Sequence, residues 1–281
     1  MTATTPTPPA SPAAPASSTS PAWKGSSPLL QIRVLTARSM RSLATDPGVI
    51  LFGLLQPVVI LFVLTQVFSK MGPPPHFPAG VSYLDYVLPA VLVDNAIQAA
   101  VQSGVGLVDD LKNGIVARLR SLPIAPSSLL VARSMTNLAR STVQAVVIMV
   151  LAIGVLGYSP RGGPAEVAAS VGLTLFMSWA LGWAFIAAGA WLRRAEPMQN
   201  LALVAVLPLM FVSSAYVPVA DLPAWLAAVA QVNPLTHAID ATRALALDIP
   251  GAGAVLPAMV ISGVVAIVSA ALAAVGFRRP M

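Results

Sequence analysis

The chain has 281 residues, of which 57% are hydrophobic and only 9% are charged, whereas soluble domains have roughly 25% charged residues. It contains no cysteine and only two histidines, His76 and His237, which excludes disulfides, thiolate catalysis and cysteine-based metal sites. The net charge of +6 comes from residues that flank long apolar runs, so we attribute it to membrane topology and not to nucleic-acid binding. The composition predicts an all-α polytopic membrane protein.

Residues 1–28 are almost all Pro, Ala, Ser and Thr, and they lack the apolar core of a signal peptide. We predict that they form a disordered tail. A helical pattern follows over Leu29–Leu43, with apolar residues on one side and Arg33, Arg38 and Arg41 beside them. This pattern predicts an amphipathic helix in the membrane interface. The alternative is that the same helix packs on a partner protein.

Six apolar runs are long enough to cross a hydrocarbon core about 30 Å thick, which requires about 20 residues per helix. The runs are Val49–Phe68, Leu84–Leu107, Ser141–Tyr158, Val167–Trp191, Leu201–Val219 and Val255–Phe277. We therefore predict that residues 29–281 form one six-span membrane domain.

The Lys and Arg residues alternate across these runs. Thirteen of the sixteen precede the first run, follow the last, or lie in the second and fourth gaps. Because positive residues concentrate on the cytoplasmic side, both termini should be cytoplasmic, and we expect the protein in a bacterial cytoplasmic membrane.

The segment between the fifth and sixth runs differs from the other gaps. Its apolar stretches are too short to cross, so we predict two short helices, about Pro223–Val232 and Leu235–Leu247, that re-enter from the outer face. Asn233-Pro234 is the expected break between them.

The chain has no recognisable nucleotide-binding motif. The three lysines are followed by Gly25, Met71 and Asn113, whereas a Walker A loop requires Ser or Thr after its lysine. Metalloprotease and nucleophile-elbow patterns are also lacking. We expect no catalytic, metal or cofactor-binding site in this chain.

The second gap is the densest polar stretch, beginning at Asp109-Asp110 and ending at Pro126. Gly114 is suited to ending the incoming helix, and Ile115–Leu122 is long enough for two helical turns. Such a short helix could be a handle for another protein. The alternative is a solvated, positively charged loop.

This stretch resembles the coupling region of type-2 ABC exporter permeases, above all the daunorubicin-resistance membrane-subunit group. The family pattern Gly-x-x-acidic-Arg-x-Arg-x-x-Pro-Ile is matched by Gly114, Arg118, Arg120, Pro123 and Ile124, and a later Gly-Arg pair by Arg133. Ala117 and Ala132 depart from the pattern, at its acidic position and at its later glycine. Asp109 or Asp110 would then substitute for the acidic residue.

A second stretch also resembles this family. The run Phe211–Leu226, followed by Val232-Asn233-Pro234-Leu-Thr-His237 and Arg243-Ala-Leu245, is similar to the outer signature of the family. The resemblance covers residues 30–281. The signature residues that we single out are Pro218, Pro223, Trp225, Asn233, Pro234, His237 and Arg243.

The resemblance implies a permease subunit of an ATP-driven exporter. Two six-span subunits, identical or different, would pair, and two copies of a separate P-loop ATPase subunit would bind ATP and Mg²⁺. The amphipathic helix and a coupling helix would contact the ATPase. The implied ATPase-coupling residues are Asp109, Asp110, Gly114, Arg118, Leu119, Arg120, Leu122 and Pro123. The substrate would be a hydrophobic or amphipathic drug, natural product or lipid. The alternative function is an ion-gradient-driven secondary transporter.

Asp94, Gln98 and Gln102 are spaced four residues apart, so they share one face of the second span. An ionisable residue at that depth normally faces protein or water. One interpretation is a substrate path that attracts amphipathic cations. The other is that these side chains bond to neighbouring helices and only hold the bundle together.

Overall fold

The computed structural model describes residues 27–45, 47–71, 76–77, 80–115, 126–159, 162–247 and 252–279, and the regular elements in them are all helical. The tail 1–26 and residues 116–125, which hold most of the predicted coupling helix, lie outside the described residues. The elements are α1 (Pro28–Thr45), α2 (Pro47–Met71), α3 (Tyr83–Lys112), α5 (Pro126–Gly154), α6 (Pro164–Leu192), α7 (Ala195–Phe211), η1 (Val219–Asp221), α8 (Ala224–Val232), α9 (Pro234–Leu247), η2 (Ala252–Ala254) and α10 (Val255–Arg278).

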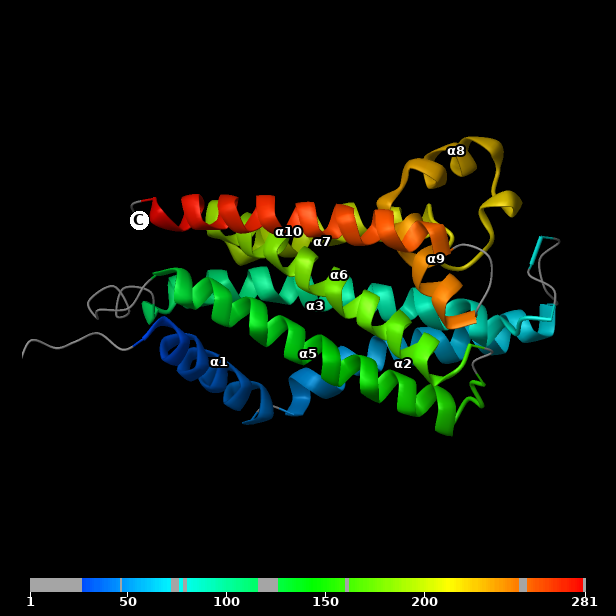
Figure 1. Ribbon diagram of the computed structural model, residues 1–281, viewed down its shortest axis with the longest axis horizontal. Coiled ribbons are helices and arrows are strands. Elements are labelled where there is room, and N and C mark those ends of the chain that lie inside the picture. The colour runs from blue at the N-terminus through cyan, green and yellow to red at the C-terminus, as the bar shows by residue number, and fades with distance from the viewer. Residues whose placement is uncertain are drawn as a thin grey trace, which may run out of the picture.

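Helices α2, α3, α5, α6, α7 and α10 run along the long axis of one bundle (Figure 1). Helix α1 packs beside α5 at the end where α10 finishes, which we call the loop end because α3 stops there and α5 starts. Helices α8 and α9 lie at the opposite end, which we call the hairpin end (Figure 1).

Four of the described helices are long and apolar enough to cross a membrane, namely α3, α5, α6 and α10. Residues Gly53–Val67 of α2 form a shorter apolar helix, and α7 has 17 residues. The expectation of an all-helical polytopic membrane protein is therefore confirmed for the part of the chain that the structure describes.

Two helix boundaries differ from the predicted apolar runs. Helix α5 begins at Pro126, well before the run at Ser141, because its first turns are polar but still helical. Helix α7 ends at Phe211 instead of continuing to Val219. There the Asn233 side chain donates to the carbonyls of Leu209 and Val212 at 2.7 and 2.5 Å, so these C-terminal carbonyls are satisfied without another helical turn.

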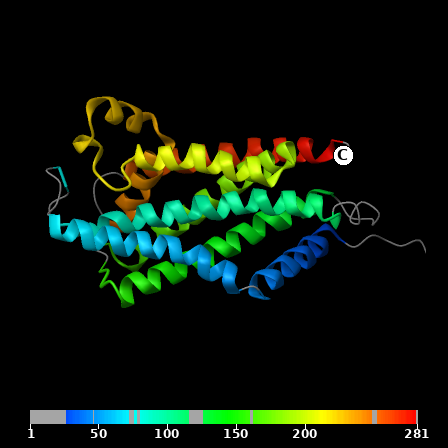
Figure 2. The ribbon, with the colours of Figure 1, turned by 180° about the vertical axis from the view of Figure 1, so that it is seen from behind.

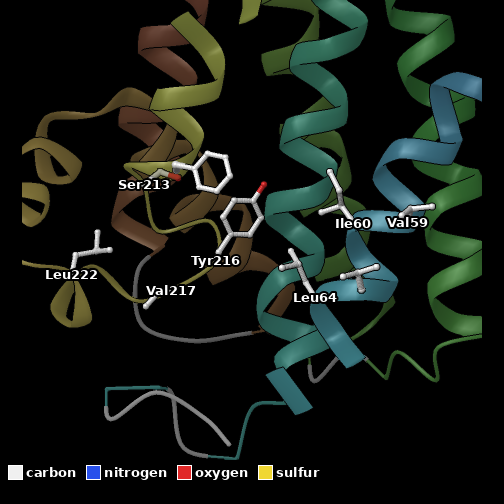
Figure 3. Close-up of a pocket in the computed structure, with 9 residues that line it drawn as sticks. Val59, Ile60, Leu64, Ser213, Tyr216, Val217 and Leu222 are labelled. Carbon is white, nitrogen blue, oxygen red and sulfur yellow. The ribbon is translucent and has the colours of Figure 1, made fainter. Parts of the chain in front are cut away.

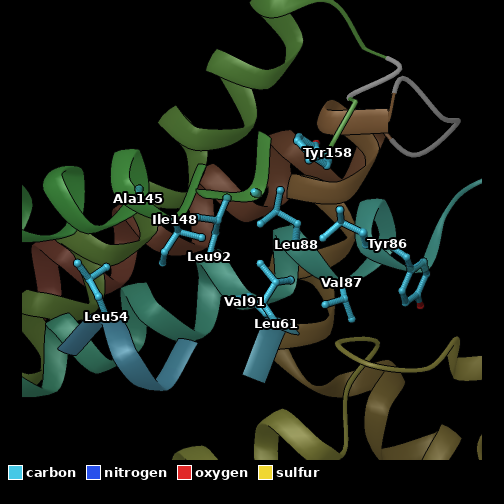
Figure 4. Close-up of a cluster of buried hydrophobic side chains, with 12 residues drawn as sticks. Leu54, Leu61, Tyr86, Val87, Leu88, Val91, Leu92, Ala145, Ile148 and Tyr158 are labelled. Carbon is cyan, nitrogen blue, oxygen red and sulfur yellow. The ribbon is translucent and has the colours of Figure 1, made fainter. Parts of the chain in front are cut away.

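Helix α3 is the central helix of the bundle. It contacts α2, α5, α6, α7 and α9, and 94% of its most apolar window is buried. From behind, α3 lies between α2 and α7 (Figure 2). Near the hairpin end a core cluster joins α2, α3 and α5, as Figure 4 shows. The labelled members of this cluster are Leu54, Leu61, Tyr86, Val87, Leu88, Val91, Leu92, Ala145, Ile148 and Tyr158.

Helices α3, α5 and α6 are joined by hydrogen bonds around Ser178. Its carbonyl accepts from Asn137 Nδ2 at 3.0 Å, its hydroxyl lies 2.6 Å from that of Ser141, and the same hydroxyl donates to Ala96 O at 3.2 Å. Such bonds between membrane helices average about 0.6 kcal/mol each. Together they fix the order of the three helices.

The backbones of α3 and α6 approach closely where two glycines meet. A Cβ on Gly189 would lie 2.8 Å from the carbonyl oxygen of Gly104. Small residues at such crossings permit close van der Waals contact, which is a main source of helix association in membranes.

This crossing generates a prediction about stability. Gly189→Ala should lower the free energy of unfolding by about 1–3 kcal/mol, because the new methyl group meets backbone that has to shift. Gly172→Ala in the same helix is the matched control, since nothing lies within 4 Å of its Cβ position, and it should be neutral or stabilising by up to about 1 kcal/mol. Unfolding of the purified protein in mixed micelles measures both. Equal effects would contradict a tight crossing.

Candidate coupling and transport sites

The described site residues fall into three groups at different heights along α3. Asp110 is near the loop end, Asp94 lies in the middle, and Tyr86 is near the hairpin end. The three groups are built from different neighbouring helices, so we describe them in turn from the loop end.

At the loop end, an ion pair joins the helices on both sides of the undescribed loop. Asp110 on α3 is buried, and its Oδ2 accepts from Arg133 of α5 through Nε at 2.7 Å and also through Nη2. Arg38 of α1 approaches the other carboxylate oxygen at 3.9 Å. A carboxylate buried between two guanidinium groups is charge-compensated. The partners of Asp110 are therefore arginines of this same chain, and Asp109 is the neighbouring carboxylate that is exposed.

Helix α1 has a second tie to α5. The Ser128 hydroxyl donates to Gln31 Oε1 at 3.0 Å, and both side chains are buried. Leu35 is buried on the same helix, whereas Leu30, Val34 and the arginines Arg33 and Arg41 are exposed. One side of α1 thus packs on the protein, and a mixed apolar and basic side remains for a membrane or a partner.

Gly114 follows α3 with a φ of +68°, a left-handed conformation that favours glycine and ends a helix. The predicted coupling residues Arg118, Leu119, Arg120, Leu122 and Pro123 lie outside the described residues. What the structure does define is the base on which this loop is mounted, namely the ends of α3 and α5 held by Asp110 and Arg133.

In the middle of α3, the predicted stripe divides into a buried and an exposed part. Asp94 is 9% exposed, whereas Gln98 and Gln102 on the same face are exposed. Among the described residues, no hydrogen bond or ion pair joins the Asp94 carboxylate to another group. Within the described part of the chain, the side of α3 that carries Gln98 and Gln102 is not covered by another helix.

An apolar cavity of about 510 Å³ lies near the hairpin end, between α2 and the segment that follows α7. Figure 3 shows Ile60 and Leu64 of α2 on one side and Tyr216 and Val217 on the other. No charged side chain is among its lining residues. Burial, with a smaller effect of the Asp94 charge, raises the pKa of Tyr216 to about 12, so its hydroxyl stays protonated. The cavity has the size and polarity of a site for a drug-sized apolar molecule.

At the hairpin end, Asn233 joins two helices. Its amide nitrogen satisfies the last carbonyls of α7, and its Oδ1 accepts from the Leu235 amide of α9 at 2.9 Å. Pro234 follows at the first position of α9, where a missing N–H does no harm. The Asn-Pro pair is therefore a helix cap that also fixes α9 to the end of α7.

Arg243 joins α9 to α3 and to the segment after α7. Its guanidinium is buried and donates to Tyr86 O at 3.0 Å, to Ser214 O at 2.7 Å and to Asp240 Oδ1 at 2.9 Å. It also lies 3.6 Å from the centre of the Tyr86 ring, a cation–π contact. Burial lowers the pKa of Arg243, and the neighbouring Tyr86 and Asp240 oppose that shift.

The remaining signature residues lie between the end of α7 and the first turn of α9. Pro218 and Pro223 precede η1 and α8, and Trp225 projects from α8 with 70% of its surface exposed. His237 Nε2 is 2.9 Å from Gln231 O. His76, from the segment before α3, contacts Asp221 through its backbone amide and through Nδ1 at 2.5 Å. Among the described residues, no group of three or more His, Asp or Glu side chains could hold a metal ion.

Several of these contacts were not predicted from the sequence. Arg133 was matched only as a family position, and its partner was not identified. Ser178, Asn137, Tyr86 and Asp240 were not singled out at all. The signal for the Asp110–Arg133 pair was weak but present, because opposite charges flank the same loop on two helices.

The apolar helical bundle with polar residues buried at three heights is the architecture of a multi-span membrane protein. A model of the ABC-2 type transporter family matches residues 30–247. The match covers most of the chain, and the chain belongs to this family.

Curated relatives support the same assignment. The chain is 26% identical over 208 residues to the daunorubicin resistance ABC transporter permease protein DrrB1 of Streptomyces coeruleorubidus, covering 74% of this chain and 72% of that protein. It is 24% identical over 251 residues to the probable doxorubicin resistance ABC transporter permease protein DrrC of Mycobacterium tuberculosis, covering 89% and 88%. It is 25% identical over 215 residues to the putative transport permease ycf38 of Pyropia yezoensis, covering 76% and 73%. The resemblance seen in the sequence is confirmed, and the chain is an ABC transporter permease.

The buried ion pair generates a second prediction. Asp110→Ala should lower the free energy of unfolding by about 2–5 kcal/mol, because it leaves the Arg133 guanidinium without its partner in a largely buried position. Asp109, the exposed neighbour, provides the matched control. Asp109→Ala should change the free energy of unfolding by less than about 0.5 kcal/mol.

The double variant Asp110→Asn/Arg133→Gln should regain much of the loss, because no unpaired charge remains. Thermal or denaturant unfolding of the four proteins provides the measurement. A double variant as unstable as Asp110→Ala would show that the charge pair is not the cause.

Proposed function

We propose that this chain is the membrane-spanning subunit of an ATP-driven exporter of a hydrophobic or amphipathic drug, natural product or lipid. ATP and Mg²⁺ would be bound by a separate P-loop ATPase subunit, since the sequence has no nucleotide motif. The observation that carries the proposal is the base of the loop at 116–125. Its two flanking helices are locked together by Asp110 and Arg133, and α1 is attached to the same unit through Arg38 and Gln31.

The ends of α3 and α5 that flank the loop would move together with α1, because these contacts join the three helices. An ATPase subunit that grips the loop would therefore pull α1, α3 and α5 together. Within the loop, Arg118 would supply the main charged contact, Arg120 a lesser one, and Leu119 and Leu122 the apolar anchors. Gly114 and Pro123 would mark its limits.

We propose that α2, α3, α5, α6, α7 and α10 each cross a bacterial cytoplasmic membrane, and that residues 29–281 form one domain. The loop end would be cytoplasmic, because most Lys and Arg residues lie there. Helix α1 begins and α10 finishes at that end (Figure 1), in accord with an even number of crossings. Helices α8 and α9 would form the outer re-entrant hairpin.

A second permease subunit, identical or different, would cover the face of α2, α3 and α7 seen in Figure 2. Gln98 and Gln102 are exposed on α3, and amide side chains in a span are expected to face protein or water and not lipid. Two ATPase subunits would complete the transporter. The substrate path would run along this face.

Within the path, we assign Asp94 as an attractor for cationic substrates. If Asp94 only held helices together, it would need a partner on a neighbouring helix, and the described residues provide none. The apolar cavity beside Tyr216 lies further toward the hairpin end, and it suits the apolar body of an amphipathic molecule.

The experiment that tests the function uses inverted membrane vesicles that contain the permease with or without its ATPase subunit. Uptake of ethidium, an amphipathic cation, should require both subunits and ATP, and it should continue when a protonophore collapses the proton gradient. The purified permease alone should hydrolyse no ATP. Uptake by the permease alone under a proton gradient would instead support a secondary transporter.

Substitution of Asp94 tests the path. Asp94→Asn should reduce ethidium uptake about tenfold or more, because loss of one desolvated charge partner costs roughly 2–5 kcal/mol. Uptake of N-phenyl-1-naphthylamine, which is uncharged, should be unchanged. An equal reduction for both probes, or loss of the folded subunit, would assign Asp94 to helix packing.

A further inference from the structure

Four arginines gather at the loop end, where α6, α7 and α10 meet. Arg193 and Arg194 form the turn between α6 and α7, and Arg278 and Arg279 end α10. Arg194, Arg278 and Arg279 are exposed, and no ion pair involves them within the part of the chain that the structure describes. The first turn of α7 carries one carboxylate, Glu196. The corner therefore has a marked excess of positive charge.

Two of the four arginines, Arg193 and Arg279, are held in place by contacts within the protein. The Arg279 guanidinium lies 3.7 Å from the centre of the Trp191 ring, and Trp191 Nε1 donates to Leu272 O at 3.1 Å. The Trp191 ring fits there because position 276 is glycine, where a Cβ would lie 2.6 Å from the ring. Arg193 donates to the carbonyls of Gly276 and Arg279 at 3.3 and 3.0 Å. These contacts order Arg193 and Arg279 before any ligand binds.

An apolar ridge on α10 leads directly to this corner. Val264, Val268, Leu272 and Val275 are exposed and spaced four, four and three residues apart, so they share one face of the helix. Arg279 is four residues further along the same face. Trp191, which is 42% exposed, stands beside the end of the ridge. A long apolar surface that finishes in an aromatic ring and cationic groups matches the shape and polarity of a phospholipid.

We propose that the basic corner of Trp191, Arg194, Arg278 and Arg279 binds the phosphate headgroup of an anionic phospholipid, whose acyl chain lies along the α10 ridge. The inference rests on the membrane placement in the proposed function. An acidic protein surface would also complement the charge, but it would make no use of the ridge. A phospholipid accounts for both the basic corner and the apolar ridge.

The test is native mass spectrometry of the purified full-length permease, titrated with phosphatidylglycerol or with phosphatidylcholine. Arg278→Gln/Arg279→Gln should weaken phosphatidylglycerol binding about tenfold or more, since each arginine near a lipid surface contributes appreciably to anionic binding. Phosphatidylcholine binding should be unchanged. Lys112→Gln removes positive charge from an exposed position at the end of α3, away from the ridge, and should leave the affinity within about twofold. Arg279→Lys keeps the charge and should retain most of the binding.

Four results would overturn the proposal. An equal loss in the Lys112→Gln control would indicate unspecific charge attraction, and an equal loss of phosphatidylcholine binding would exclude headgroup recognition. Competition by millimolar inorganic phosphate would indicate a site for free anions. If Arg278→Gln/Arg279→Gln left lipid binding unchanged but released the ATPase subunit when the two subunits are co-expressed and purified together, the corner would instead bind a protein partner. Because the lipid measurement uses the permease alone, its failure is distinct from a failure of ATP-dependent uptake, and thermal unfolding shows whether each variant is folded.

Discussion

The close crossing of α3 and α6 is the contact on which the rest of the structure depends. Between apolar helices in a membrane there is little hydrophobic driving force, so close packing and interhelical hydrogen bonds hold the bundle together. Gly104 and Gly189 bring the two backbones into contact, and Ser178 then bonds to both α3 and α5. With α2, α7 and α9 also against it, most of α3 is buried within this chain, apart from the side that carries Gln98 and Gln102.

Helix α3 has 30 residues and is about 45 Å long, and it connects the two ends of the bundle without a break in its chain. Arg133 contacts it at Asp110 near the loop end, and Arg243 contacts it at Tyr86 near the hairpin end. In the proposed exporter, a displacement of the loop by the ATPase would reach the outer hairpin through this one helix. Asp94 lies between the two contacts, so the same displacement would change its surroundings.

The loop end has two separate groups of basic residues with different surroundings. Arg133 and Arg38 face the buried carboxylate of Asp110, and they belong to the unit formed by α1, α3 and α5. Arg278 and Arg279 lie on the α10 side, beside Trp191 and an exposed apolar ridge. Charge that is compensated inside the protein holds helices together, whereas charge that is left uncompensated at a membrane surface attracts anions. The proposed ATPase and lipid contacts therefore involve different helices.

The sequence by itself determined that the chain is a helical membrane protein, because apolar length and charge alternation depend only on local composition, and two of its motifs showed the resemblance to this family. The predicted Asn233-Pro234 break coincides with the boundary between α8 and α9, since caps are local signals. The sequence did not determine where α5 begins or where α7 ends, because polar turns continue the first helix and a distant asparagine terminates the second. Nor did it pair Asp110 with Arg133 or Arg243 with Tyr86. Those pairs are 23 and 157 residues apart, and only the packing of α3 against α5 and α9 brings them within hydrogen-bonding distance.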